Sequence, residues 1–295
     1  MFDLQSYLTE KRAVIDSALD RYLPPEERYP QELFRAVRYG VLQGGKRLRP
    51  TLTLAACEAV GGDAEVAMPT ACAVEFIHAF SLIHDDLPAL DNDDLRRGQP
   101  TTHKVFGEPI AILAGDVLLA YAFQTIAQFT RDASPSIVLE VSRRVAAATG
   151  AEGMVVGQVV DMISEGRQVD GKTMEFMHAN KTGALLKVAV VSGGLLGGGT
   201  PEQVSALETY GEKIGLAFQI ADDILDIVGD ETKIGKPVGS DLEQRKSTYP
   251  GLYGLTRSRE LARQASDGAV AALQPFDDRA EPLRSIARFI VERDS

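Results

Sequence analysis

Two clusters of aspartates are the residues whose types and spacing point most directly to chemistry. They stand in sequence that is otherwise mostly apolar and repeats with the period of a helix. The clusters are Asp85, Asp86 and Asp91 in the first half of the chain and Asp222, Asp223 and Asp226 in the second. Mg²⁺ takes carboxylate oxygens from a protein, keeps several waters and shares the phosphate oxygens of a substrate. The two clusters together predict magnesium chemistry on a phosphorylated substrate.

The first cluster follows an apolar helical stretch and is interrupted by Pro88. Adjacent carboxylates at the C-terminal end of a helix are unfavourable, because the helix dipole and their mutual repulsion both oppose them. A regular helix would turn Asp91 roughly 240° away from Asp85, but Pro88 breaks or kinks a helix and lets the carboxylates converge. A solvated acidic helix end is the alternative for this segment alone. Arg96 and Arg97 just beyond it weaken that alternative, since they suit phosphates.

The second cluster predicts a stripe on a regular helix. Gln219, Asp222 and Asp226 recur at i, i+3 and i+7, and Asp223 falls on the adjacent face. The residues between them are apolar, so the stripe is expected to border an interior, where charges need partners or metals. One cluster of this type is a weak signal. Two in one helical chain, with arginines after the first, are a strong one.

Helices separated by proline and glycine are the elements that must position these clusters. Apolar positions recur every three or four residues, as in Val141–Ala148 and Val204–Ala217. Strand-like alternation bounded by hairpin turns is not evident. We predict one all-α domain over residues 1–295. Breaks are expected at Arg21–Pro30, Gly61–Asp63, Gly98–Pro109, Asp132–Ser136, Ser164–Gly171, Gly197–Pro201, Gly229–Gly251 and Gln274–Pro282.

The segment Gly229–Gly251 has weak periodicity and is rich in cations. Loops of this length are uncommon in compact domains and are often lids or binding loops. We expect a closing element here, with a plain solvated connection as the alternative. Its cations include Lys233, Lys236, Arg245 and Lys246.

The amino-acid composition restricts the kinds of molecule that the protein is expected to bind. The net charge of −11 argues against nucleic acid or an anionic membrane, because both attract a basic surface. An anionic substrate then needs local cations or bound metal. Cys57 and Cys72 lack metal-ligand spacing and are expected to be buried in a reducing compartment. Neither a signal peptide nor a membrane span is predicted, which favours a cytoplasmic enzyme.

Several motifs together resemble a known family, the short-chain trans-isoprenyl diphosphate synthases, and are close to the bacterial farnesyl diphosphate synthases. The resemblance implies an all-α bundle around a deep central cavity, usually as a homodimer. The motifs are LQGGKRLRP (Leu42–Pro50), SLIHDDLPALDNDDLRRGQPTTH (Ser81–His103), AGDVLLAYAF (Ala114–Phe123), GMVVGQVVDM (Gly153–Met162), NKTGALL (Asn180–Leu186), GLAFQIADDILDIVGD (Gly215–Asp230), GKPVGSDL (Gly235–Leu242) and KSTYP (Lys246–Pro250).

The resemblance also implies a role for each matching residue. Asp85 and Asp91 would ligate two Mg²⁺ on an allylic diphosphate, and Asp222 a third, with Asp86, Asp223 and Asp226 as supporting carboxylates. The allylic diphosphate would be held by Arg96, Lys181, Thr182, Gln219 and Lys236, and the homoallylic one by Lys46, Arg49, His78 and Arg97, with Lys246 completing the lining. The catalytic group would be Asp85, Asp91, Asp222 and Lys181. Taken singly, a lysine such as Lys181 is more often a solvated surface residue, and His78 a core histidine.

The chemistry that the family implies needs these charges. Ionisation of an allylic diphosphate leaves a carbocation and a highly charged leaving group, which divalent cations and Lys or Arg donors stabilise. The double bond of isopentenyl diphosphate then attacks the cation and a proton is lost. No dedicated base is evident, so by family analogy the released diphosphate takes the proton. A water-poor cavity protects the cation.

Product length is expected to depend on Phe80 and Ser81. Phe80 lies five residues before Asp85, about 7.5 Å along the helix, and in this family bulk there floors the pocket for the growing tail. With the Leu87–Leu90 spacer, Phe80 resembles the farnesyl pattern, although a plain core phenylalanine is the alternative. A geranylgeranyl or geranyl synthase differs only in this floor.

Two other classes of protein fit the sequence less well. A terpene cyclase also carries an aspartate-rich motif, but GGKRLRP and Arg97 argue against it because cyclases lack a homoallylic site. A non-catalytic synthase subunit would have lost one cluster, and both are intact. The chain ends in Val-Glu-Arg293-Asp-Ser rather than in the basic tail of many relatives, so a tail contact with the homoallylic diphosphate is in doubt.

Overall fold

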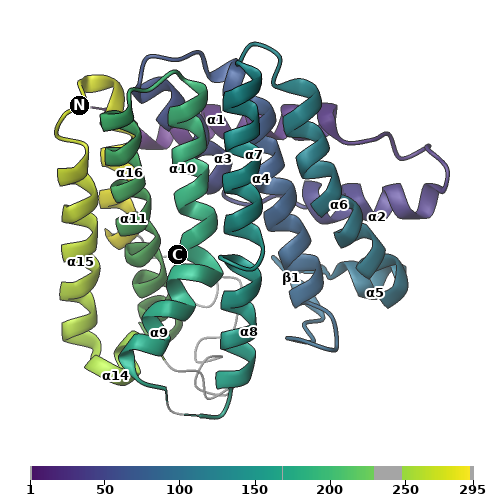
Figure 1. Cartoon of the computed structure of the whole chain (residues 1–295). Helices are drawn as coiled ribbons and strands as arrows, with labels where there is room; N and C mark the ends of the chain where they lie inside the picture. Colours follow the sequence, from purple (N-terminus) through teal and green to yellow (C-terminus); the bar gives the residue numbers. More distant parts are fainter. Residues whose placement is uncertain (1, 168, 229–247, 293–295) are drawn as a thin grey trace.

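The computed structural model describes residues 2–167, 169–228 and 248–292, and their regular secondary structure is helical apart from two short strands (Figure 1). The predicted all-α class is confirmed. In chain order the elements are α1 (Leu4–Tyr22), α2 (Gln31–Leu42), α3 (Leu48–Ala59), α4 (Ala64–Asp85), β1 (Leu95–Arg96), β2 (Gln99–Pro100), α5 (Thr102–Phe106), α6 (Glu108–Phe129), α7 (Pro135–Thr149), α8 (Met154–Ser164), α9 (Gly171–His178), the π-helical turn η1 (Ala179–Gly183), α10 (Ala184–Leu196), α11 (Pro201–Val228), α14 (Tyr249–Tyr253), α15 (Leu255–Ala272), the 3₁₀ turn η2 (Asp278–Ala280) and α16 (Glu281–Glu292).

Helices α3, α4 and α10 form the interior of the bundle. Most residues of α10 and the greater part of α4 are buried, and these helices pack on one another. One apolar core joins α4 to α1, α2 and α6, and a second joins α3 and α10 to α11, α15 and α16. The aspartate clusters therefore stand on two helices, α4 and α11, that belong to different halves of the core.

The start of α4 shows how the sequence fixes a helix boundary. The side chain of Asp63 accepts a hydrogen bond from the amide of Glu65 at 3.0 Å, which satisfies a donor that has no partner inside the helix. Gly61 before it has a φ of +90°, a conformation that glycine adopts without strain. The predicted break at Gly61–Asp63 is thus a capped turn between α3 and α4.

Four local features differ from the sequence prediction. A hairpin of β1 and β2 and the short helix α5 lie within or beside the predicted break Gly98–Pro109, although no hairpin was expected. The loops 43–47 and 150–153 interrupt helices where no break was predicted. Each of these features is only a few residues long, so periodicity averaged over a helical window does not detect it.

The end of the predicted lid is helical. Tyr249–Tyr253 forms α14, capped by the hydroxyl of Thr248, which accepts from the amide of Gly251 at 3.2 Å. The expected structureless segment is therefore wrong for its last residues. Residues 229–247 lie outside the described part of the chain, as do Lys236 and Lys246, and so does Arg293 at the C-terminal end.

Two helices are long and apolar enough to cross a membrane by length and composition alone. They are α4, with 78% of its most apolar window buried, and α6, with 39%. Burial in the bundle accounts for α4, because a core helix passes the same test. Burial in the bundle does not account for α6, which keeps exposed apolar residues such as Ile112 and Leu113. Cys57 and Cys72 are both free and buried, as predicted.

Candidate active site

The first aspartate cluster lies where α4 ends. Helix α4 stops at Asp85, and the amide of Asp86 still donates to the carbonyl of Leu82 at 3.1 Å. The chain then passes through Pro88 and turns back, so that the amide of Asp91 donates to the carbonyl of Asp85 at 2.8 Å. The predicted helix break is confirmed, and it returns Asp91 to the side of Asp85.

Asp86 holds Arg96. The buried carboxylate accepts from Nε of Arg96 at 2.8 and 3.0 Å, and Asp93 lies 3.7 Å from the same guanidinium. Arg96 stands on β1, opposite Gln99 of β2, so the unpredicted hairpin presents the arginine to the aspartate. A bidentate pair fixes the plane of a guanidinium. Asp86 therefore orients Arg96 beside the other two aspartates.

Asp85 is partly buried among other charges. Burial raises the pKa of Asp85 to about 6, while Lys181 opposes this rise and Asp91 adds to it. A carboxylate whose charge is costly is one that a nearby cation stabilises. The electrostatics of this position thus suit a hard divalent cation.

The described residues contain no ready-made metal cage. In residues 2–167, 169–228 and 248–292, no three His, Cys, Asp or Glu side chains are placed to hold an ion together. Mg²⁺ is usually bound by one or two carboxylates together with waters and substrate phosphate oxygens. Asp85 and Asp91 fit that arrangement, in which the metal arrives with a diphosphate.

Lys181 reaches the cavity from the π-helical turn η1. Its ammonium forms an ion pair with buried Asp161 of α8. Burial opposes the charge on Lys181, but Asp161, and then Asp85 and Asp91, outweigh it and raise the pKa of Lys181. The lysine is a positioned charge facing the first cluster, and the alternative of a solvated surface lysine is wrong.

Asp161 is a site residue that sequence reasoning missed. It lies within the GMVVGQVVDM motif, so a signal was present, but nothing in its helix spacing points to a lysine twenty residues later. Backbone contact brings the two together. A Cβ at Gly157 would lie 2.1 Å from the amide nitrogen of Lys181, so α8 and η1 approach closely only because Gly157 has no side chain.

The loop before α3 is anchored by Arg47, a second residue that the sequence did not single out. Its buried guanidinium donates to Asp16 and Glu75 at 2.8 Å each and to the carbonyl of Val41 at 2.8 Å. Arg49, two residues on, carries a buried Nε for which no acceptor is found among the described residues. Arg47 is thus structural, and Arg49 retains a donor for a ligand.

Cations surround His78 on α4. Burial, and then the guanidinium groups of Arg49, Arg97, Arg96 and Arg47, hold the pKa of His78 well below its usual range. Part of this shift in pKa reflects positive neighbours, because each positive charge opposes protonation of the imidazole. The predicted homoallylic residues Arg49, His78 and Arg97 are therefore close together.

Arg97 reaches the loop before α3 directly. Its guanidinium donates to the carbonyl of Gly44 and occupies the space where a Cβ on Gly45 would lie, within 2.7 Å of Nη1. The two glycines have φ values of +88° and +134°. The glycine pair thus makes room for the arginine. Lys46 on the same loop is exposed.

The second cluster lies on α11 as predicted. Asp223 is buried and accepts from the amide of Tyr249 at 2.9 Å and from Nε2 of Gln219 at 3.2 Å. Burial lowers the pKa of the Arg49 guanidinium, and Glu75 and then Asp222, which is partly exposed, oppose part of that lowering. Asp223 therefore holds the start of α14, while Asp222 lies towards Arg49.

A cavity of about 410 Å³ joins the charged residues to an apolar interior. Of the predicted site residues, Arg49, His78, Asp85, Lys181, Thr182, Phe80 and Ser81 line it. Its other lining residues were not predicted and are Leu82, His84, Leu90, Met154, Val155, Gln158, Val159 and Met162. Lys46, Asp91, Arg96, Arg97, Gln219 and the second cluster are not among the lining residues.

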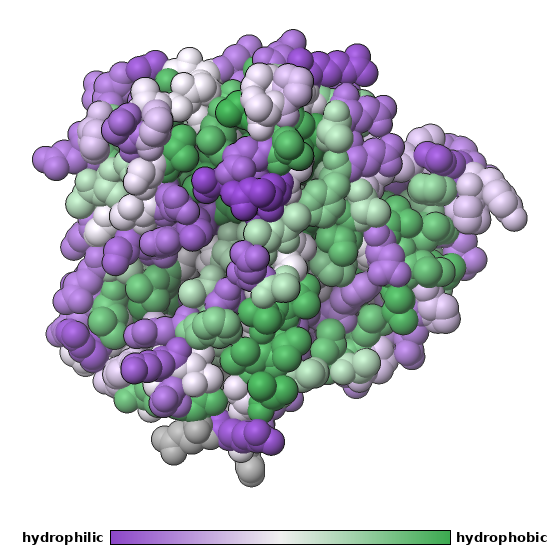
Figure 2. All heavy atoms as spheres, viewed as in Figure 1, coloured by the Kyte–Doolittle hydropathy of each residue, from purple (hydrophilic) through white to green (hydrophobic). Residues whose placement is uncertain are grey.

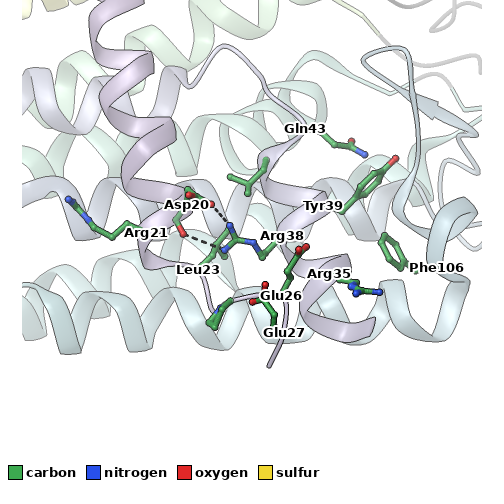
Figure 3. Close-up of a pocket in the computed structure, with 12 residues that line it drawn as sticks. Asp20, Arg21, Leu23, Glu26, Glu27, Arg35, Arg38, Tyr39, Gln43 and Phe106 are labelled. Atoms are coloured by element: carbon green, nitrogen blue, oxygen red, sulfur yellow. Dashed lines mark hydrogen bonds and ion pairs between the residues drawn. The ribbon is translucent and has the colours of Figure 1, made fainter. Parts of the chain in front are cut away.

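A larger cavity, of about 920 Å³, lies between the end of α1 and α2 (Figure 3). Its walls mix both signs of charge, and Arg38 is tied to Asp20 and to the carbonyl of Pro24 at 3.2 Å. None of the predicted site residues lines it. Because none of the predicted site residues lines this cavity and its Arg38 is already paired, the smaller cavity is the candidate active site.

Comparison with known proteins shows the family of the chain. A family model described as polyprenyl synthetase matches residues 30–279. The chain belongs to the polyprenyl synthetase family. It is 45% identical over 295 residues to a geranylgeranyl diphosphate synthase of Cyanophora paradoxa, covering 100% of this chain and 98% of that protein. It is 46% identical over 292 residues to a farnesyl diphosphate synthase of Geobacillus stearothermophilus, covering 99% and 98%.

A solved structure is similar to this chain and supports the same family. The apo FPP/GFPP synthase from Zymomonas mobilis matches with a TM-score of 0.87 and 38% identity over 98% of both chains. The predicted resemblance to short-chain trans-isoprenyl diphosphate synthases is confirmed. As a member of the polyprenyl synthetase family, the chain is a prenyltransferase of isoprenoid biosynthesis that acts on prenyl diphosphates.

Proposed function

We propose that this polyprenyl synthetase joins isopentenyl diphosphate to dimethylallyl and then geranyl diphosphate and releases farnesyl diphosphate. The observation that carries the proposal is a single cavity with Asp85 and Lys181 at its charged end and Phe80 in its apolar wall. The charged end suits a diphosphate and the apolar part suits a prenyl tail. We propose that residues 1–295 act as one domain in this reaction.

Two diphosphates need two sets of donors, and the structure supports both. Near the first cluster, Arg96 is oriented by Asp86 and Lys181 by Asp161. These cations suit the allylic diphosphate, beside Thr182. Arg49, whose Nε has no acceptor among the described residues, and Arg97 lie around His78 and suit the homoallylic diphosphate, with Lys46 on the loop before α3.

Magnesium would be held by Asp85 and Asp91, with Asp222 approaching from α11, and we expect three ions per site. Bound Mg²⁺ supplies Lewis-acid stabilisation of the leaving diphosphate. The chain's own residues do the rest. Lys181 and Arg96 donate to the same leaving group, and the apolar walls exclude water from the cationic carbons. We propose that the released diphosphate accepts the proton, since no other base was identified from the sequence.

Farnesyl diphosphate is proposed because of Phe80. Its ring is buried and lines the cavity, five residues of α4 before Asp85 or about 1.4 helical turns. Geranylgeranyl diphosphate is the second candidate, because relatives such as the Cyanophora paradoxa protein are named for it. The two products differ by one isoprenyl unit, so the product that is released depends on how far the prenyl tail can extend past Phe80.

Product analysis tests the proposal. Purified protein is incubated with isopentenyl diphosphate, Mg²⁺ and each allylic diphosphate in turn, and the products are separated by chromatography. We expect fifteen-carbon product, its loss with EDTA, and a shift to twenty carbons or more in Phe80→Ala. Twenty-carbon product from the parent protein would select the second candidate. Condensation of no pair would refute the synthase proposal, and cyclised hydrocarbon would indicate a terpene cyclase.

We further propose a cytoplasmic homodimer formed on the exposed apolar face of α6 and α8. The exposed residues there include Ile112 and Leu113 on α6 and Val159 and Ile163 on α8. Figure 2 shows hydrophobic side chains gathered over α8 and, to its right, towards α5 and α6. Apolar patches of this kind mark interaction sites. A second copy covering them would explain why α6 is apolar on its outer side.

A further inference from the structure

The rings of Phe80 and His84 form a packed pair on the α4 wall of the cavity. Both residues line the cavity, and their ring centroids lie 4.9 Å apart with 77° between the planes. They are one helical turn apart, so the contact is an edge-to-face pair along one face of α4. The position of the Phe80 ring is therefore restricted by the position of the His84 ring.

His84 is itself held by α6. Its Nε2–H donates to the carbonyl of Ile112 at 3.0 Å. The ring also fills the space beside buried Gly115, where an ideal Cβ would lie 2.2 Å from Nε2 and 2.5 Å from Cδ2 of His84. The three heavy atoms nearest to that Cβ position all belong to the His84 ring. Gly115 thus leaves a notch in α6 that the imidazole occupies.

We propose that His84, seated in the Gly115 notch, sets product length together with Phe80. The inference rests on the proposed function, in which Phe80 limits the prenyl tail. His84 is a specificity-determining wall residue, because it lines the cavity and packs against the limiting ring. Gly115 is a positioning residue that acts through His84.

Removal of the imidazole should lengthen the product. In His84→Ala the Phe80 ring loses its neighbour and the space between α4 and α6 opens, so the tail can extend further. We expect the ratio of longer to parent-length product to rise about tenfold, the effect of a 1.36 kcal/mol change in relative barriers. His84→Phe keeps a ring and should keep the parent product. The ratio of long to short product does not depend on the amount of folded enzyme, so a lower yield of folded protein does not change the result.

An added methyl group at Gly115 should act in the opposite direction. In Gly115→Ala the imidazole must leave the notch and move towards the cavity, which shortens the product. In the double variant Gly115→Ala/His84→Ala there is no ring to displace, so the product should match that of His84→Ala. This dependence of one substitution on the other is the signature of a positioning role.

Ile83→Ala is the matched control. Ile83 is a buried neighbour on the same helix, and it does not line the cavity. Its Cδ1 packs on Gly40 of α2, where a Cβ built on the glycine would lie 2.4 Å from that Cδ1. We expect lower stability and the parent product. A shift of product length in Ile83→Ala similar to that in His84→Ala would show that any loss of packing in α4 suffices, and would overturn the inference.

The outcomes separate this inference from the proposed function. No condensation by the parent protein refutes the proposed function. An unchanged product in Phe80→Ala refutes the role of Phe80. A longer product in Phe80→Ala but not in His84→Ala refutes the inference alone. A Gly115→Ala effect that persists in the double variant refutes the notch mechanism.

Discussion

At the scale of single residues, the ammonium of Lys181 depends on the carboxylate of Asp161. A hydrogen bond to a charged group contributes about 1.5–3 kcal/mol, so we expect Asp161→Asn to lower kcat/KM for the allylic substrate by roughly 10- to 100-fold. The loss should appear for that substrate and not in the KM for isopentenyl diphosphate. Glu165→Gln, at the exposed end of the same helix, is the control. Equal loss for both substrates would argue against a pairing role.

Another residue-scale prediction concerns His178 at the end of α9. Burial lowers the pKa of His178 from 6.5 to about 4, although Asp161 opposes the shift. The unfolded chain therefore takes up the proton at a higher pH than the folded protein does, and stability falls as pH drops from 6.5 towards 4. The contribution is up to about 3 kcal/mol.

Urea unfolding from pH 7.5 to 4.5 measures this contribution. We expect His178→Gln to show a flatter dependence of the free energy of unfolding on pH than the parent protein. Identical slopes would mean that other groups account for the acid sensitivity. The imidazole Nδ1 is buried and has no partner among the described residues, so its neutral form is already confined to an apolar setting.

At the scale of elements, the contact between α8 and η1 positions the cationic wall. A Cβ at Gly157 would lie 2.1 Å from the nitrogen and 2.6 Å from the Cα of Lys181, and backbone atoms cannot rotate away. Gly157→Ala should therefore push the two elements apart, lower the free energy of unfolding by about 1–3 kcal/mol and reduce activity. Thermal unfolding and product assays measure both effects.

Gly268 on α15 is the matched control for this substitution. It is also helical, but a Cβ there would meet only side-chain atoms of Lys213, at 3.5 Å or more. Gly268→Ala should be neutral or stabilising by about 0.5–1 kcal/mol, because alanine favours a helix over glycine. Similar losses of stability and activity at Gly157 and Gly268 would show that the close approach of α8 and η1 is not the cause.

At the scale of the whole molecule, association through α6 and α8 is the testable feature. Leu113 on α6 is 50% exposed, and a charge there would have to lose its hydration in an apolar interface. We expect Leu113→Asp to convert a dimer into a monomer in sedimentation velocity. Phe289→Asp, on α16 at the other side of the bundle in Figure 1, should leave the dimer intact. A parent protein that sediments as a monomer would refute the proposal.

The protein and its diphosphate substrates are both negatively charged, and the distribution of charge within the molecule explains how they can bind. The net charge is −11, yet Arg49, Arg97 and Arg96 are close enough to the His78 imidazole to add to the lowering of its pKa that burial causes. Local potential in a cavity depends on the nearest charges, because distant surface charges are screened by salt. An acidic protein can therefore bind two polyanions.

Much of the site could be predicted because its motifs have local causes. Pro88 lacks a backbone donor and so favours the end of the helix just after the paired aspartates, and a repeat of i, i+3 and i+7 places Gln219, Asp222 and Asp226 on one face of any helix. The all-α class followed from periodicity for the same reason. The short hairpin at Leu95–Pro100 could not be predicted in this way, because strands of two residues carry no periodicity.

Spacing and composition predicted most of the helices, the two aspartate clusters and the family to which the motifs belong. Which carboxylate holds which cation came from the packing of the helices: Asp86 holds Arg96, Asp161 holds Lys181, and Glu75 with Asp16 holds Arg47. That packing also seated His84 against Gly115, residues that lie on different helices. Helical periodicity relates residues three or four apart, whereas these contacts depend on how closely separate helices pack, which spacing along the chain does not encode.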